Sequence, residues 1–169
     1  MNFKFVVQQL GLLVLVLSAI LLAIALGTLA VLMFGGTVSK PATMALLISA
    51  GGGGLLGGAL WFATRRVEEH LARREALLLV AVSWFLGAAI AAMPYFLWAH
   101  LDESLVEYPF TSYIDCYFEA MSGLTTTGAT VLSDIHRRPP SLLLWRALTH
   151  WLGGLGIVVL FVAVLPSLG

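Results

Sequence analysis

Long apolar segments separated by short polar stretches form the main pattern of this chain. Four such segments stand out: Leu10–Phe34, Thr43–Ala63, Ala76–Ala99 and Leu142–Leu165. The first three carry no charged side chain, whereas the fourth contains Arg146 and His150. A helix needs roughly 20 apolar residues to cross the hydrocarbon core of a bilayer. The pattern therefore predicts an all-α membrane protein with four membrane-spanning helices.

The four segments fall into two groups. Residues 1–66 form a pair of N-terminal transmembrane helices, and residues 67–169 form one unit with a polar loop between its helices. We expect that unit to contain an outer helix at about 74–99, a re-entrant pore helix at about 112–122, a filter loop at 125–130 and an inner helix at about 141–165. The first pair lacks a comparable loop, so we interpret it as an addition to the loop-bearing unit.

Composition supports lipid as the solvent of this chain. Hydrophobic residues make up 60% and charged residues 11%, and the mean hydropathy is +0.97. Soluble domains are about 45–50% apolar and about 25% charged. The formal net charge is zero, which gives no indication of nucleic-acid binding. Cys116 is the single cysteine, so an intrachain disulfide is excluded.

The loops between the segments indicate an orientation. Residues 65–74 contain four arginines, and positive charge in short loops marks the cytoplasmic side. This places the N-terminus in the cytoplasm and the acidic loop with Glu103 and Glu107 outside. Arg137 and Arg138 then lie on the outer side, against the rule. We expect a multi-pass protein of the cell inner (plasma) membrane with membrane lipid as its surroundings.

A short helix is predicted between the third and fourth segments. Ser112 followed by Asp115 fits a capping box, and Tyr113 to Ser122 supplies about three turns, roughly 15 Å. Gly123 is placed to end this helix, because glycine readily adopts the left-handed conformation found at helix ends. A helix that enters from outside and stops there directs its negative dipole end toward the membrane centre, where it favours a cation.

The run Ser122-Gly-Leu-Thr-Thr-Thr-Gly-Ala-Thr130 follows at once. Irregular backbone at membrane depth persists where it is buried in protein or lines water. Selectivity filters for potassium use rings of backbone carbonyls in place of the water shell of the ion. We expect this loop to supply one quarter of such a filter, and the alternative is a polar surface loop. The expected K⁺ ligands are the carbonyls of Thr126, Thr127 and Gly128, followed by Ala129 and the Thr126 hydroxyl.

Gly128 is expected to turn its carbonyl toward the axis, because glycine tolerates positive φ. Arg146 and His150 share a helix face. Arg146 either pairs with Glu119 or Asp134 or extends to the outer headgroups. The residues expected to support the filter are Glu119, Gly123, Thr125, Thr130 and Arg146.

Close helix packing is expected in the second helix, where glycines between Gly51 and Gly58 allow a neighbouring helix to approach closely.

Catalytic chemistry has little support. The chain contains no zinc-protease, nucleophile-elbow or phosphate-cradling motif. Ser122 with His150 is the only pair from which an intramembrane hydrolase could be built. We therefore expect no enzymatic activity and no cofactor. A non-conducting membrane scaffold or accessory subunit is the competing interpretation.

The motifs also carry a family resemblance. The segment Phe118-Glu-Ala-Met-Ser-Gly-Leu-Thr-Thr-Thr-Gly-Ala-Thr-Val131 resembles the first pore loop of the Trk/Ktr potassium-uptake family. The motifs Trp145-Arg146, Trp151-Leu-Gly-Gly-Leu-Gly156 and Leu165-Pro166 are similar to the inner helix of its first repeat. Together these motifs cover roughly residues 70–169. The leading helix pair resembles the extra N-terminal pair of the TrkH branch by topology more than by motif.

The resemblance implies a potassium transporter built like a channel, with four loop-bearing repeats around a pseudo-fourfold axis. It implies a homodimer when complete and a cytosolic nucleotide-binding regulatory ring as partner. This chain departs from the family by stopping at Gly169 after one repeat. We expect a fragment of a longer transporter that pairs with its remaining repeats. Alternatively, four copies of this chain assemble into the pore.

Overall fold

The computed structural model describes residues 3–65, 73–102, 109–135 and 138–164. Within these ranges the regular structure is helical and contains no strand, which confirms the all-α prediction. Parts of several predictions lie outside the described residues. They are the basic loop from Arg66 to residue 72, the acidic Glu103 and Glu107, Arg137, and the predicted helix end at Leu165 with Pro166.

Five α-helices and one 3-10 turn follow one another in the described residues. They are α1 (Phe3–Met33), α2 (Lys40–Thr64), α3 (Arg73–Leu101), η1 (Pro109–Thr111), α4 (Tyr113–Leu124) and α5 (Pro140–Val164). Three segments are long and apolar enough to cross a membrane: α1, α2 and the part of α3 from Glu75 to Leu101. α5 is not among these candidates over its described part, which contains Arg146 and His150. Its crossing of the membrane stays a prediction.

The turn between α1 and α2 is specified by local chemistry. Gly35 has a φ of 80°, and its amide donates to Leu32 while the amide of Gly36 donates to Val31. These two bonds form a Schellman motif, which needs a left-handed residue and so favours glycine. Ser39 then caps α2, because its hydroxyl accepts from the Ala42 amide at 3.3 Å.

α1 and α2 pack with very little between them. A Cβ added to Gly57 would lie 2.8 Å from the Gly11 carbonyl oxygen, and one added to Gly53 would overlap the Ser18 hydroxyl. Small residues at an interface let membrane helices approach this closely. The predicted glycine packing of the second helix is therefore confirmed for these two glycines, whereas Gly51 and Gly52 face open space.

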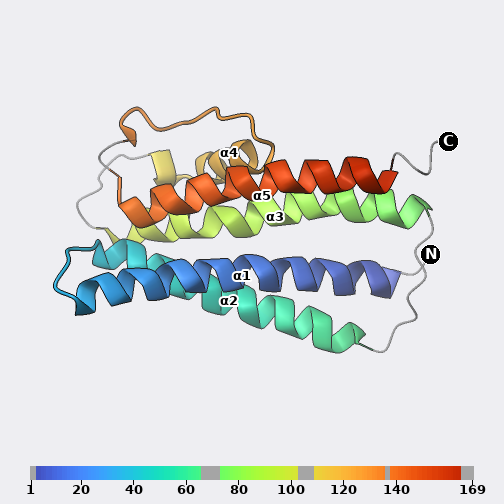
Figure 1. Cartoon of the computed structure of the whole chain (residues 1–169), viewed down its shortest axis with the longest axis horizontal. Helices are drawn as coiled ribbons and strands as arrows, with labels where there is room; N and C mark the ends of the chain where they lie inside the picture. Colours follow the sequence, from blue (N-terminus) through green and yellow to red (C-terminus); the bar gives the residue numbers. More distant parts are fainter. Residues whose placement is uncertain (1–2, 66–72, 103–108, 136–137, 165–169) are drawn as a thin grey trace.

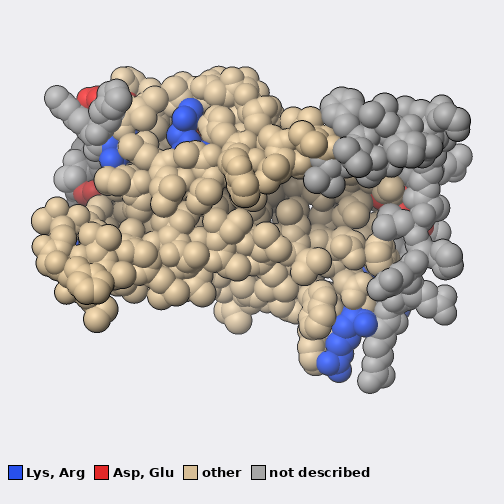
Figure 2. Space-filling model, in the orientation of Figure 1, with Lys and Arg blue, Asp and Glu red and all other residues tan. Residues whose placement is uncertain are grey.

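α3 and α5 lie side by side between the α1–α2 pair and the short α4, as Figure 1 shows. Trp145 of α5 is fully buried, and its indole N–H donates to the Ala91 carbonyl of α3 at 3.0 Å. On the face drawn in Figure 2, charged side chains lie mainly toward the two ends of the long axis. The surface between them is largely uncharged, as a membrane-embedded protein requires.

Candidate cation site at the loop after α4

α4 is too short to span a bilayer. Its 12 residues cover about 18 Å, against a hydrocarbon core of about 30 Å. Two tyrosines one turn apart fasten it to α3. The Tyr113 hydroxyl donates to the Ala89 carbonyl at 3.0 Å, and the Tyr117 hydroxyl to the Phe85 carbonyl at 3.4 Å. α4 thus lies along α3, and the chain turns back after it.

The predicted capping box at the start of α4 is wrong. Ser112 is the N-cap residue, but its side chain makes no capping hydrogen bond. A capping box would also use the side chain of Asp115 to bind the Ser112 amide. That amide already donates to the Pro109 carbonyl at 3.1 Å. The preceding 3-10 turn therefore already satisfies the Ser112 amide, which is the group that a capping box would bind.

The predicted helix stop at Gly123 is also wrong. α4 continues to Leu124, and the left-handed conformation occurs at Thr126, with a φ of 58°. Gly123 has a different use, because a Cβ there would overlap the Thr149 hydroxyl of α5. Gly153 of α5 makes a similar contact, since a Cβ there would overlap the Leu124 carbonyl. The two glycines bring α4 and α5 into direct contact.

Amides of the loop turn back onto the end of α4. Thr126 donates to Gly123 at 2.9 Å, and Thr127 donates to Ser122 at 3.0 Å. The Gly128 amide reaches the same Ser122 carbonyl at 3.5 Å. Gly128 has a φ of 77°, as predicted for this position. The amides of Thr126, Thr127 and Gly128 therefore all point toward the helix.

The carbonyl oxygens of the same three loop residues remain available as acceptors. Among the hydrogen bonds of the described residues, none ends on the carbonyl oxygen of Thr126, Thr127 or Gly128. Residues 125–130 are exposed. Within the described ranges, no group of three His, Cys, Asp or Glu side chains could hold a metal ion. A cation at this loop would therefore meet carbonyl and hydroxyl oxygens.

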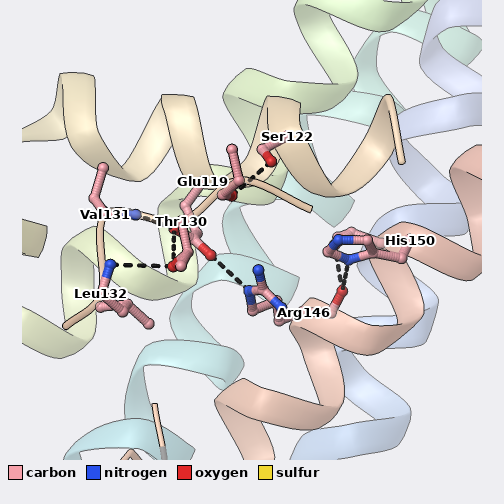
Figure 3. Close-up of polar contacts among 9 residues, drawn as sticks. Glu119, Ser122, Thr130, Val131, Leu132, Arg146 and His150 are labelled. Atoms are coloured by element: carbon pink, nitrogen blue, oxygen red, sulfur yellow. Dashed lines mark hydrogen bonds and ion pairs between the residues drawn. The ribbon is translucent and has the colours of Figure 1, made fainter. Parts of the chain in front are cut away.

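Ala129 differs from its neighbours. Its carbonyl oxygen accepts the Ser122 hydroxyl at 2.6 Å (Figure 3). The Thr126 hydroxyl donates to the Thr125 carbonyl at 2.7 Å, and the Thr125 hydroxyl donates to the Met121 carbonyl at 2.8 Å. These bonds favour the three carbonyls from Thr126 to Gly128 over Ala129 as ligands. Ser122 was not expected to shape the loop, because its role depends on where the chain returns.

The C-terminal end of the loop is tied to Glu119, as Figure 3 shows. This buried carboxylate accepts the Thr130 hydroxyl at 2.9 Å and the Val131 amide at 3.0 Å through Oε2. Its Oε1 accepts from Arg146 Nε at 2.6 Å. The Leu132 amide donates to the Thr130 hydroxyl at 3.0 Å. Of the alternatives considered for Arg146, the structure shows the pairing with Glu119, which joins α4, the loop and α5.

Ser122 and His150, considered above as a catalytic pair, bind elsewhere. The Ser122 hydroxyl is used by Ala129, and His150 Nδ1 lies 2.8 Å from the Arg146 carbonyl (Figure 3). A serine nucleophile needs a base within hydrogen-bond reach of its hydroxyl. The arrangement therefore gives the Ser122–His150 pair no support.

Known proteins resemble this chain over most of its length. Residues 53–169 match the family described as TrkH, cation transport protein. The chain is 36% identical over 151 residues to Trk system potassium uptake protein TrkH of Salmonella typhimurium, covering 83% of this chain and 30% of that protein. It is 39% identical over 114 residues to Trk system potassium uptake protein TrkG of Escherichia coli, covering 68% and 22%.

A third relative aligns along the whole chain. Trk system potassium uptake protein TrkH of Halomonas elongata is 34% identical over 169 residues, covering 100% of this chain and 32% of that protein. The chain thus spans about a third or less of the length of these relatives. Because the family match includes α3, α4, the loop and α5, this chain belongs to the TrkH family of cation transport proteins.

Proposed function

We propose that this chain supplies one of four pore loops of a channel-like potassium uptake protein. The observation that carries the proposal is the run of three unbonded carbonyls at Thr126, Thr127 and Gly128. Their amides are held against α4, so the carbonyl oxygens are available to an ion. Carbonyl rings of this kind replace the hydration shell of potassium in selectivity filters. Ala129 is the weaker fourth ligand, because Ser122 occupies its oxygen.

Potassium is the proposed ion for two reasons. The relatives named above are described as potassium uptake proteins. The loop also offers neutral oxygens without a carboxylate facing the ion, since Glu119 is paired with Arg146. A single loop provides a fraction of the oxygens that a dehydrated ion needs. The remaining ligands would come from further repeats of a longer protein or from other copies of this chain.

The supporting residues act on the backbone of the loop. Glu119 and Thr130 fix its outer end, and Arg146 neutralises the carboxylate that holds them. At the inner end, the Thr125 hydroxyl binds the last turn of α4, and Gly123 admits α5. In this proposal none of the five contributes an ion ligand. They keep the three carbonyls aimed in one direction.

Several further features belong to the same proposal. The complete protein would lie in the inner membrane with its N-terminus in the cytoplasm, as the arginines of residues 65–74 suggest. It would form a homodimer and bind a cytosolic nucleotide-binding regulatory ring, as the family resemblance implies. We expect no enzymatic activity and no cofactor. The loop and its backbone oxygens carry the function instead.

Growth on limiting potassium tests the proposal. This chain would replace the matching part of Salmonella typhimurium TrkH, and the chimera would be expressed in bacteria that lack potassium uptake. We expect the chimera to restore growth, and a chimera without residues 125–130 to fail at equal expression. A loop-deleted chimera that still restores growth would overturn the proposal.

The chain expressed alone separates the remaining alternatives. Growth restored by the 169-residue chain would support four copies around one axis. No growth with the chain alone, together with growth of the chimera, would support a loop that works beside other repeats. A chimera that inserts into the membrane and assembles but passes no potassium would support the non-conducting scaffold.

A further inference from the structure

A cavity of about 400 Å³ lies between α1, α3, α5 and the last residue of α4. Its lining includes Leu17 of α1, Trp84 and Gly87 of α3, Leu124 of α4, and Gly153 and Gly156 of α5. The glycines supply space, because no side chain projects from α3 or α5 at these points. None of the described residues that line the cavity belongs to the loop at 125–130.

The described lining of the cavity is almost wholly apolar. Among the described lining residues, the polar side-chain groups are the indole N–H of Trp84 and the hydroxyl of Ser83, which already donates to the Leu79 carbonyl of its own helix at 2.6 Å. A buried water needs two to four polar partners. Pockets of about 300–1,000 Å³ with hydrophobic walls instead hold apolar ligands. The occupant is therefore an apolar molecule or group.

The surroundings identify the source of that group. α1 and α3 are membrane-spanning candidates, and both carry exposed apolar side chains beside the cavity. Val16, which lines the cavity, is 47% exposed, and Phe85, which follows the lining residue Trp84 in the sequence, is 65% exposed. The cavity thus adjoins an apolar surface on helices that are long enough to cross a membrane. A void next to hydrocarbon is unfavourable when empty, because its walls lose their dispersion contacts.

We propose that the acyl chain of a membrane lipid occupies this cavity and packs against Leu124 and Gly153. This inference depends on insertion into a bilayer and not on the proposed potassium function. It places a lipid tail behind the final residue of α4, one position before Thr125. The contact between α4 and α5 at Gly153 would then form one wall of a lipid site.

Photo-crosslinking tests the occupant directly. The 169-residue chain would be reconstituted in phosphatidylcholine vesicles containing a lipid with a diazirine on its acyl chain. After illumination, the labelled residues would be mapped by mass spectrometry. Leu17 and Leu124 are the reporters, because they are 3% and 7% exposed and lie on the cavity wall. Phe62 of α2, which is 60% exposed, reports ordinary lipid contact.

A matched pair of variants gives the control. Gly156→Leu places a side chain in the cavity, where the nearest atom to an added Cβ is Trp84 at 4.0 Å. Gly52→Leu makes the same change on α2, where nothing lies within 4 Å. We expect Gly156→Leu to lower labelling of Leu17 and Leu124 at least about fivefold, and Gly52→Leu to leave it unchanged. Labelling of Phe62 should stay constant in both.

Two results would overturn the inference. One is labelling of Phe62 without labelling of Leu17 or Leu124, and the other is reporter labelling that Gly156→Leu does not reduce. If Gly156→Leu fails to insert, Ser83→Leu fills the cavity from the opposite wall and is judged by the same criterion. Protection of both reporters in the Salmonella chimera would assign the cavity to other parts of the protein and would also overturn it.

Discussion

The Glu119 carboxylate of α4 lies 2.6 Å from Arg146 Nε of α5, and its other oxygen holds the Thr130 hydroxyl and the Val131 amide. One buried charge thereby connects three segments that are far apart in the sequence. Its side chain has no exposed surface, whereas that of Arg146 keeps 19%. A carboxylate in such a place requires full pairing, since an unpaired buried charge is strongly destabilising.

Glu119→Gln keeps the shape of the side chain and removes its charge. Removing one partner of a buried ion pair typically costs about 3–5 kcal/mol. Because water still reaches part of Arg146, we expect a loss of about 3 kcal/mol in the free energy of unfolding. Unfolding in detergent micelles, followed by the circular dichroism of the helices, measures it. Asp115→Asn, one turn earlier on α4, is the matched control and should change the midpoint little.

Gly128→Ser forces an L-residue into a φ of 77°. Such a conformation costs roughly 1–2 kcal/mol for residues other than glycine. The backbone is expected to relax by turning the carbonyl at this position away from the proposed ion path. In the Salmonella chimera, the variant should pass sodium more readily relative to potassium, as measured by the uptake of both ions. Gly52→Ser is the control, and unchanged selectivity in Gly128→Ser would contradict the assignment of this carbonyl.

Thr126→Gly should relieve backbone strain. Thr126 is β-branched and has a φ of 58°, which such residues rarely adopt. We expect the free energy of unfolding to stay equal or to rise by about 1 kcal/mol. Thr127→Gly, next to it and without a positive φ, should lower stability by about 0.5–1 kcal/mol through chain entropy. Equal losses in the two variants, measured by denaturation, would show that Thr126 is unstrained.

Gly153→Ala and Gly154→Ala are neighbouring changes with opposite expected effects. A Cβ at Gly153 would overlap the Leu124 carbonyl, which is backbone and cannot rotate aside. Overpacking of this kind costs about 1–3 kcal/mol. At Gly154 the nearest atom to an added Cβ is a Thr126 methyl at 3.8 Å. Alanine there should stabilise α5 by up to about 1 kcal/mol, and thermal unfolding distinguishes the two.

The helices could be predicted from the sequence because the bilayer leaves few choices. A backbone in hydrocarbon must satisfy its own hydrogen bonds, so an apolar run such as Thr43–Ala63 becomes a helix. The same logic made a partner for Arg146 predictable, and Glu119 is that partner. The effects of charge and of apolar length act over short distances, so the helices and the need for a charge partner can be recognised in the sequence.

The details of the loop depended on tertiary contacts and could not be predicted. Glycine is the usual left-handed residue, yet Thr126 takes that role while Gly123 stays helical against α5. The Ser122 hydroxyl binds the Ala129 carbonyl seven positions later, which requires knowing how the chain returns. The conformation of Gly128 was predictable, because a positive φ is a local property.

The glycine contact between α5 and the end of α4 has a mechanical consequence. At Gly153 no side chain separates α5 from the Leu124 carbonyl, so no rotamer change can absorb a shift between them. A sideways movement of α5 by about one ångström must therefore displace the carbonyl end of the short helix or open a gap there. A displacement that starts at the far end of α5 would in this way pass from Gly153 to Leu124, and along the chain through Thr125 to Thr126.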